Sequence, residues 1–451
     1  MKIFIASIVI IFLLAGCEAS YTPDKIKPYT EPIPEPEPIP EVIPREWTFV
    51  VYMAADNNLE AAAIADFNEL EGIDLAGQRV SILALLDRGP GYDATNGDWT
   101  DTRLYEITTD PGGNNATIIS KRLDCPEMGL SAASNTELDM ADPLVLSQLL
   151  DYAKRVYSAD NYGLLVWGHG TGWKGSGTAG GQIPEPMKAV AIDDTNGSTY
   201  MQLKSFGTAV KNKGLKVVGF DTCFGALLEL AYQIRGDAAY LVGSEGLIPS
   251  NGWDYTSLFT SFLLSSLSPS DFCESAIDQF SAQYSGTLNA AISMIDLAEI
   301  DNLVDTFEDF SLVLTAAITA GNKTTVRDAI LTGSTIERYY DTPPSDLYID
   351  IESFGEAMSG LLSVDASALQ GALDSAVPKS WPKKGSADRH KLGIYVIGLT
   401  GVGVPMGSHD PGYIKGSSSM GKSAFVERSN YWVPHFNPAP PTSVLDKLFY
   451  W

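Results

Sequence analysis

The sequence predicts an α/β fold in which helices cover both faces of a mostly parallel β-sheet, with a smaller α+β subdomain at the C-terminal end. Short, continuously apolar runs recur along the chain, as expected of strands that are buried on both faces. Segments with apolar residues at helical spacing separate these runs. Strands that alternate with helices are joined by crossover connections, and such strands lie parallel in one sheet.

The elements can be placed in order along the chain. A first strand at 48–53 ends at Asp56 and Asn57, either of which can cap the helix that follows. Asp142 and Pro143 open a second helix, because aspartate accepts from the N–H groups of a first turn and proline has none to satisfy. The other predicted strands are 80–86, 162–167, 190–192, 215–220 and 238–243, and the other helices are 203–210 and 224–234.

The pattern is weaker in two regions. A loop-rich insertion is predicted from about residue 89 to 135, where Gly, Asn and Asp are frequent. Beyond Trp253 the sequence predicts helices around 256–283 and 301–319 and strands at 290–295 and 392–397.

The N-terminus has the pattern of an export signal. Lys2 is followed by an unbroken apolar run, residues 3–14, which is too short to span a bilayer. The run ends in Leu-Ala-Gly-Cys, the bacterial lipobox, in which Cys17 is diacylated and the signal peptide, residues 1–16, is removed. Several acyl chains anchor a protein stably where one does not. The sequence therefore predicts an exported lipoprotein of the cell envelope; the alternative is a secretory signal with an incidental cysteine.

The composition changes after the signal. Residues 17–45 are rich in proline and glutamate and have no apolar periodicity, which predicts an extended tether. The remaining roughly 400 residues exceed a usual single domain. We expect an α/β core over residues 46–255 and a C-terminal part, residues 256–451, that completes the same unit.

The net charge of the chain excludes some classes of partner, and its cysteine count bears on disulfide formation. The chain has 56 acidic and 30 basic residues, which gives a net charge of −26. Nonspecific binding to nucleic acid or to anionic lipid is therefore not expected. With Cys17 assigned to the lipid, Cys125, Cys223 and Cys273 remain; because their number is odd, at least one thiol should lie outside any disulfide.

Two residues of catalytic type follow predicted buried strands. His169 lies in the glycine-rich loop after 162–167, and Cys223 comes shortly after 215–220. Crevices of parallel sheets lie at the carboxyl ends of the strands, so neighbouring strands would bring imidazole and thiol together. A helix starting at residue 224 would lower the pKa of Cys223, and His169 can shuttle a proton near neutral pH. The N–H groups of Gly170 and Cys223 could form an oxyanion hole.

Each of these residues also has a structural explanation. A cysteine at a strand end is often a small buried residue, and a histidine among glycines is often a surface turn residue. Together, at the ends of two central strands, they indicate nucleophilic chemistry. His390, His409 and His435 lack this context, and no His/Cys/Asp cluster has the spacing of zinc ligands, so no metal site is predicted.

Six short segments carry a family resemblance. They are Tyr52–Leu59, Met140–Pro143, Val166–Trp173, Val218–Cys223, Gly252–Tyr255 and Gly393–Tyr395. Through them the chain resembles the clostripain-like cysteine peptidases, a bacterial branch of the caspase-like superfamily. The match runs in order across most of residues 47–400, which is far more specific than a bare cysteine and histidine.

The resemblance implies a caspase-like sheet, a catalytic dyad of His169 and Cys223 without a required third member, and cleavage after basic residues. It also implies that Asp221, two positions before the nucleophile, lines the S1 pocket, where its charge would pair with Arg or Lys at P1. The alternative for Asp221 is a carboxylate that caps the following helix.

The nucleophile segment departs from the family pattern. Thr222 and Phe224-Gly225 stand where the family commonly has Ala and Leu-Met, so substrate preference is less well defined than reaction type. Some relatives are activated by cutting between the histidine and cysteine segments, and the glycine-rich loop from Lys174 to Lys188 offers basic cleavage points for this. Self-cleavage would create new N-termini on incubation, whereas a fully active intact chain would exclude it.

The predicted function is a cysteine endopeptidase that cleaves after Arg or Lys through an acyl-enzyme. One alternative is a catalytically inactive relative that binds peptides or proteins; the presence of His169, Gly170 and Cys223 argues against it. Another is a different cysteine-dependent hydrolase on the same scaffold. The expected partners are protein or peptide substrates and, through the lipid, a membrane. No cofactor is expected, and the sequence leaves a calcium requirement and the oligomeric state open.

Overall fold

The computed structural model describes residues 44–113, 117–172, 190–285, 290–318, 321–339, 348–381 and 391–395. From Pro44 onward the chain forms one compact unit. The other unit, Met1–Ile43, lies outside the described residues, and with it the predicted signal peptide, Cys17 and most of the tether. In the part of the chain that is described, no helix is both long and apolar enough to cross a membrane.

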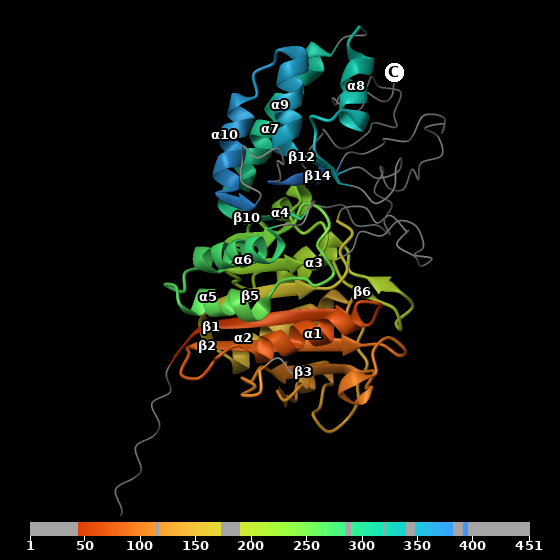
Figure 1. Ribbon diagram of the computed structural model, residues 1–451, viewed down its shortest axis with the longest axis vertical. Helices are drawn as coiled ribbons and strands as arrows, with labels where there is room; N and C mark the ends of the chain where they lie inside the picture. The colour runs from red at the N-terminus through yellow and green to blue at the C-terminus, as the bar shows by residue number, and fades with distance from the viewer. Residues whose placement is uncertain are drawn as a thin grey trace, which may run out of the picture. The chain divides into compact units, whose positions relative to one another are not determined.

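A nine-stranded sheet forms the centre of the unit from Pro44 onward (Figure 1). Its five middle strands run parallel to one another, in the spatial order β9, β8, β5, β1 and β2. The mostly parallel sheet that the sequence predicts is therefore confirmed. The bounds are β9 (Tyr240–Gly243), β8 (Val217–Asp221), β5 (Ala159–Trp167), β1 (Arg45–Ala55) and β2 (Val80–Arg88).

Strand β1 shows why the middle strands are apolar throughout. Val50, Tyr52 and Ala54 belong to one hydrophobic cluster, and Val51 and Met53 belong to a second. Successive side chains of a strand point to opposite faces of the sheet. A strand that is covered on both faces therefore needs apolar residues at every position, which is the continuous pattern in the sequence.

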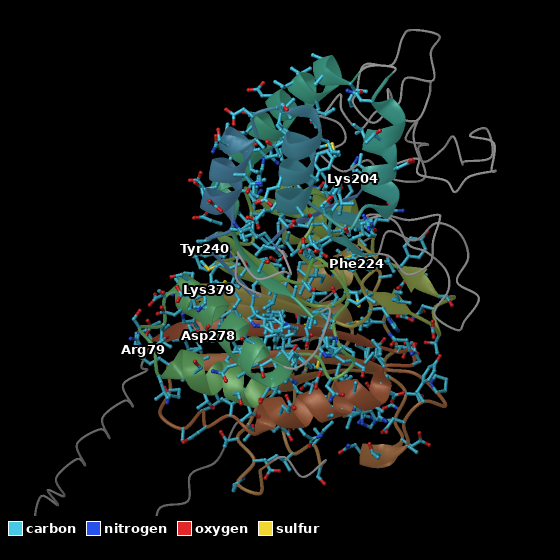
Figure 2. The ribbon with its side chains drawn as sticks, turned by 45° about the horizontal axis from the view of Figure 1, so that its top comes forward. Arg79, Lys204, Phe224, Tyr240, Asp278 and Lys379 are labelled. Atoms are coloured by element: carbon cyan, nitrogen blue, oxygen red, sulfur yellow. The ribbon has the colours of Figure 1, made fainter. Side chains whose placement is uncertain are left out.

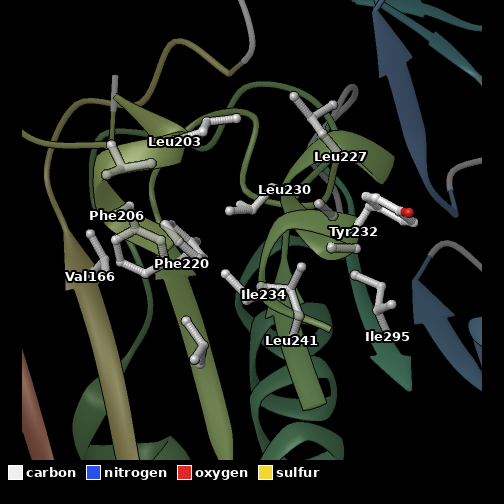
Figure 3. Close-up of a cluster of buried hydrophobic side chains, with 14 of the residues drawn as sticks. Val166, Leu203, Phe206, Phe220, Leu227, Leu230, Tyr232, Ile234, Leu241 and Ile295 are labelled. Carbon is white, nitrogen blue, oxygen red and sulfur yellow. The ribbon is translucent and has the colours of Figure 1, made fainter. Parts of the chain in front are cut away.

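Helices cover both faces of the sheet (Figure 1). On the Val51 face, the ring of Phe49 packs against those of Phe259 and Phe272, with centroid distances of 5.0 and 4.8 Å. On the opposite face, Phe206 lies 5.2 Å from Phe220, ring centroid to ring centroid (Figure 3). The Val51 face is covered by α1 (Glu60–Glu71), α5 (Tyr255–Leu263) and α6 (Pro269–Tyr284), and the other by α2 (Pro143–Val156), α3 (Leu203–Val210) and α4 (Leu228–Ile234).

Both edges of the large sheet are antiparallel. Strands β3 (Thr102–Glu106) and β4 (Lys121–Arg122) continue the sheet beyond β2. They lie inside the insertion predicted to be loop-rich. The sequence pattern missed them because β3 is short and mixes polar with apolar residues, and β4 consists of two basic residues. Beyond β9 come β10 (Ile292–Asp296) and β13 (Lys379–Trp381). Lys379 of β13 forms a 2.8 Å ion pair with Asp278 of α6 (Figure 2).

The C-terminal part adds a second sheet and a group of helices. Among these helices, the one predicted around 301–319 is present, whereas the others were not predicted. Two of the unpredicted helices place their buried residues among glycines and polar residues, so they lack a clear apolar pattern. The short sheet consists of β11 (Arg338–Tyr339), β12 (Tyr348–Asp350) and β14 (Gly393–Tyr395). The helices are α7 (Ile300–Ala317), α8 (Lys323–Thr332), α9 (Ile351–Leu362) and α10 (Ser367–Ala376).

Two predicted helix starts have different outcomes. Asp142 accepts a hydrogen bond from the first turn of α2, as predicted. Helix α1 has no side-chain cap: Asn57 accepts from the N–H of Leu59, which precedes the helix, and Asp56 accepts from the N–H of Thr195. The predicted cap by Asp56 or Asn57 is therefore wrong, because Asp56 is bound to a segment far away in the sequence. Thr195 lies in the turn of the small hairpin formed by β6 (Ile192–Asp193) and β7 (Thr199–Tyr200).

Candidate active site

His169 and Cys223 follow two neighbouring parallel strands. β5 pairs with β8, and Trp167 and Asp221 are the last partners in the register. His169 and Cys223 each come two residues after these partners. Because loops from the carboxyl ends of neighbouring strands meet at one edge of a sheet, the two residues share that edge.

The loops that carry them are in direct contact. The N–H of Gly168 donates to the carbonyl oxygen of Asp221 at 3.4 Å. A Cβ atom at Gly170 would lie 2.2 Å from the carbonyl oxygen of Cys223 and 2.6 Å from the hydroxyl of Thr222, so only glycine allows this approach. The glycine next to His169 is therefore needed to bring the imidazole loop against the thiol turn.

His169 is half-buried and has one hydrogen-bond partner that the sequence did not predict. Its Nε2 lies 2.8 Å from Oδ1 of Asn58. With an amide oxygen as the acceptor, Nε2 carries the proton and Nδ1 remains as the base. Burial lowers the pKa of His169 below its usual value, and Asp194 opposes this shift. Asn58 also follows a central strand, β1, and that shared position was the sequence feature from which it could have been found.

Cys223 lies in a turn and not at a helix N-terminus. Helix α4 begins only at Leu228, so the predicted helix from residue 224 is wrong at its start. The intervening residues bind the segment after β9 instead: Phe224 donates to the carbonyl of Gly246 at 2.9 Å. The half-buried thiol receives a hydrogen bond from the N–H of Ile248, with 3.3 Å between nitrogen and Sγ.

Asp221 ends β8 and is almost completely buried. Its Oδ2 accepts from the N–H of Trp253 at 3.0 Å and from the hydroxyl of Tyr255 at 3.1 Å, whereas Oδ1 has no hydrogen-bond partner in the described structure. It does not cap α4, whose start has no side-chain cap. Burial raises the pKa of Asp221 to about 7, and its two hydrogen bonds oppose the shift.

A second buried carboxyl, Asp66 of α1, lies close to Asp221. A Cβ atom at Gly252 would be 2.6 Å from Oδ2 of Asp221 and 3.0 Å from Oδ2 of Asp66. The indole N–H of Trp167 donates to Asp66 at 2.6 Å. Burial first, and then the charge of Asp221, raises the pKa of Asp66 to about 9. Asp66 therefore holds a proton at neutral pH, and sequence reasoning gave it no role.

Residues 51–387 match the model of the clostripain family of peptidases, which is most of the chain. The chain belongs to this family. Clostripain of Hathewaya histolytica is 31% identical over 228 residues, which are 47% of this chain and 41% of that protein. The chain thus matches less than half the length of that relative.

Two solved structures of clostripain-family (C11) proteins share the fold. A secreted C11 cysteine protease from Bacteroides thetaiotaomicron, in complex with an irreversible peptide inhibitor, has 21% identity and a TM-score of 0.53, covering 74% of this chain and 84% of that one. An inactive zymogen C11 protease from Parabacteroides distasonis has 20% identity and a TM-score of 0.53, covering 79% and 93%. These likenesses confirm the predicted caspase-like fold.

Phe224, one of the residues that depart from the family pattern described above, contacts the C-terminal part. The ring of Phe224 stacks on that of Tyr348 of β12, with centroids 4.6 Å apart; Figure 2 labels Phe224. The hydroxyl of Tyr348 also donates to the carbonyl of Thr171, two residues after His169, at 2.8 Å. The C-terminal part therefore supports both loops of the candidate site.

The other cysteines of this clostripain-family chain are poor nucleophile candidates. Burial raises the pKa of Cys125 to about 11 and that of Cys273 still further. Both thiols are therefore un-ionised at neutral pH. The described cysteines form no disulfide with one another. The loop from Lys174 to Lys188, where self-cleavage was predicted, lies outside the described residues.

Proposed function

We propose that the chain is a cysteine endopeptidase in which Cys223 is the nucleophile and His169 the general base and acid. The observation that carries the proposal is the β5–β8 register, with the His169 loop pressed against the Cys223 turn through Gly170. Membership of the clostripain family supports the same reaction. The half-exposed position of Cys223, against the buried Cys125 and Cys273, supports the choice of nucleophile.

The proposed reaction uses groups that are already oriented. Nδ1 of His169 takes the thiol proton, and the N–H of Ile248 favours the thiolate by donating to sulfur. Sulfur attacks the peptide carbonyl, and the resulting oxyanion accepts from the N–H groups of Gly170 and Cys223. The imidazolium then protonates the leaving amine, and water hydrolyses the acyl-enzyme. Among the described residues the N–H of Gly170 has no other acceptor.

We further propose that Asp221 binds Arg or Lys at P1. Its Oδ1 is buried and lacks a donor, whereas Oδ2 is held by Trp253 and Tyr255. A buried carboxylate oxygen without a donor is costly, and a guanidinium or ammonium group would relieve that cost. The fixed second oxygen would orient the carboxylate toward the entering cation.

Hydrolysis of fluorogenic peptides tests both proposals. Purified full-length chain and its Cys223→Ala variant are compared on peptides that differ only in Arg, Lys, Asp or Leu at P1. Cleavage after Arg or Lys that is absent in the variant is expected. Cleavage only at another P1 residue would refute the role of Asp221. No cleavage at all, even after trypsin nicking of the 174–188 loop and added calcium, would favour a peptide-binding protein instead.

We also propose that Cys17 anchors the chain in the cell envelope. The support is the sequence Leu-Ala-Gly-Cys after an apolar run. Labelled palmitate should be incorporated into the wild-type chain and not into Cys17→Ser, and only the wild type should sediment with membranes. Equal labelling of both would refute the anchor without affecting the proposed peptidase activity.

A further inference from the structure

The segment that follows β9, residues 244–248, is hydrogen-bonded to the Cys223 turn. The carbonyl of Gly246 accepts from the N–H of Phe224 at 2.9 Å, and the N–H of Ile248 donates to Sγ of Cys223 at 3.3 Å. A hydrogen bond weakens steeply when its donor is misaligned, so the position of this segment decides how well its N–H stabilises a thiolate. We refer to residues 244–248 as the thiol-supporting segment.

An acid in this segment, Glu245, is completely buried. Its side chain is hydrogen-bonded to that of Asp350, the N-cap residue of α9 in the C-terminal part. Two carboxyl groups can form a hydrogen bond only when one of them carries a proton. Burial first, and then the charge of Asp350, raises the pKa of Glu245 well above its usual value. Glu245 is therefore the protonated partner, and it donates to Asp350.

The acceptor of this hydrogen bond is held in place by backbone donors. Oδ1 of Asp350 accepts from the N–H of Ser353 at 2.7 Å, and Oδ2 accepts from the N–H of Lys391 at 3.2 Å. Burial raises the pKa of Asp350 to about 6, and these two donors oppose the shift. At neutral pH the pair therefore consists of a neutral acid, Glu245, and a carboxylate, Asp350.

The charged groups of the C-terminal part around this pair are mostly acidic. Glu337 and Glu352 both raise the pKa of Glu245. The ammonium group of Lys391 lies 3.6 Å from Oε1 of Glu352 and also pairs with Asp374 of α10. Ionisation of Glu245 would thus place a further negative charge among acids that repel it in a medium of low dielectric constant.

Strand β14 touches both Glu245 and the Cys223 turn. A Cβ atom at Gly393 would lie 3.2 Å from Cβ of Glu245, so the strand packs tightly against this acid, and Gly393 brings no charge to it. The N–H of Gly393 donates to the carbonyl of Ala226 at 3.0 Å. On the core side, the titratable group that the thiol-supporting segment contacts is the thiol of Cys223 itself.

We propose that Glu245, as a neutral acid, is a positioning residue for the nucleophile. The inference rests on the proposed function of Cys223. By donating to Asp350, Glu245 anchors the thiol-supporting segment to the C-terminal part, and the N–H of Ile248 stays directed at sulfur. If Glu245 released its proton to water, two carboxylates would face each other, and their repulsion would displace the segment and weaken the donation to sulfur.

Alkylation of Cys223 by iodoacetamide tests the proposal without a peptide substrate. Full-length wild type, Glu245→Gln and Glu245→Ala are compared at pH 7, and mass spectrometry of the Cys223 peptide gives the rates. Glutamine keeps a donor for Asp350, so Glu245→Gln should react within about twofold of the wild type. Glu245→Ala should react roughly tenfold more slowly, because the hydrogen bond to the charged sulfur is weakened. A side chain that only fills space would not be replaced by glutamine alone.

Thermal unfolding tests the proton on Glu245 independently of the thiol. Because the folded-state pKa lies above the ordinary value of 4.5, the stability that the proton contributes is lost as the pH rises from about 4.5 toward the folded-state value. Glu245→Gln cannot ionise, so its Tm should fall less between pH 5 and pH 9 than that of the wild type. Asp365 is exposed, and the N–H of Ser367 lowers its pKa, so Asp365→Asn should follow the wild type.

Two results would overturn the proposal. One is an equal rate of alkylation in the wild type, Glu245→Gln and Glu245→Ala. The other is a Tm of Glu245→Gln that falls with pH in parallel with the wild type, which would show that Glu245 carries no proton. If Glu245→Ala does not fold, Glu245→Met replaces it, since methionine keeps the volume and lacks the donor. If no peptide is cleaved but these differences hold, the proposed peptidase function fails and the positioning of Cys223 by Glu245 stands.

Discussion

Among the buried carboxylates of this molecule, two groups near the carboxyl ends of the central strands differ in how their oxygens are satisfied. Between Asp66 and Asp221, neutral donors hold one oxygen of each, from Trp167, Trp253 and Tyr255. Burial raises the pKa of both carboxyls, to about 9 for Asp66 and to about 7 for Asp221, so a proton on Asp66 lowers the net charge of the pair. One oxygen of Asp221 remains open.

The second group, which we call the four-carboxylate cluster, consists of Asp56, Asp87, Glu137 and Asp193. The four-carboxylate cluster differs in the number of its acids and of its open oxygens. It brings more acidic groups within 4.8 Å of one another, and open oxygens remain on Asp56 and Asp87. A pair with one open oxygen suits a single positive charge that comes and goes with substrate. Four acids within such a span are oxygen ligands of the kind that calcium takes. The comparison shows that burial of acids alone does not indicate a role, and that the number of open oxygens must be counted as well.

The largest expected effect concerns the pair that has one open oxygen. Asp221→Asn should lower kcat/KM for a peptide with Arg at P1 by roughly 100-fold or more, because removal of one partner of a buried charge pair costs this much. The rate of Cys223 alkylation by iodoacetamide serves as the control for an intact site. An equal loss of alkylation and of peptide cleavage would show that Asp221 supports the fold and not P1 binding.

A smaller effect is expected at Asn58, which comes two residues after Asp56 of the four-carboxylate cluster and contacts His169. Asn58→Ala should lower kcat/KM by roughly tenfold, since the hydrogen bond that orients Nε2 is lost. Asn58→Asp should restore much of the rate because a carboxylate also accepts from Nε2. The pH dependence of Cys223 alkylation should shift in the alanine variant. Unchanged profiles in both variants would contradict an orienting role.

The raised pKa of Asp66 in the buried pair predicts how the stability of the fold depends on pH. The folded-state pKa of Asp66 is raised to about 9, above its ordinary value of 3.8, so the folded state binds the extra proton and loses stability as pH rises from about 4 to about 9. Asp66→Asn cannot ionise, so its Tm should fall less than that of the wild type between pH 5 and pH 9. Thermal unfolding across this range measures the difference, and parallel curves would refute it.

The smallest effect is expected where no charge is involved. Tyr348→Phe keeps the ring stack on Phe224 and loses only the hydrogen bond to the carbonyl of Thr171. A neutral hydrogen bond contributes about 1 kcal/mol, so kcat/KM should change by no more than roughly fivefold. The change should not depend on pH. A larger, pH-dependent loss would mean that the C-terminal part acts on the titrating groups of the site.

The fold and the position of the dyad could be predicted because their patterns are local. Continuous apolar runs identify the middle strands β1, β2, β5 and β8, and His169 and Cys223 come directly after two of them. The edge strands β3 and β4 were missed because short antiparallel edges lack such runs. The start of α4 was wrong because residues 224–227 bond to the segment after β9, which no local pattern indicates.

The sequence by itself determined the alternation of strands and helices, the family resemblance, and which two residues stand at the ends of central strands. The tertiary structure alone decided that Asn58 meets His169, that Asp66 lies beside Asp221, and that four acids between residues 56 and 193 converge. Which residues are buried can be predicted from the pattern of apolar residues along a single strand or helix. Contacts between polar side chains depend on strand register and on loops from distant parts of the chain, so they appear only once the sheet is assembled.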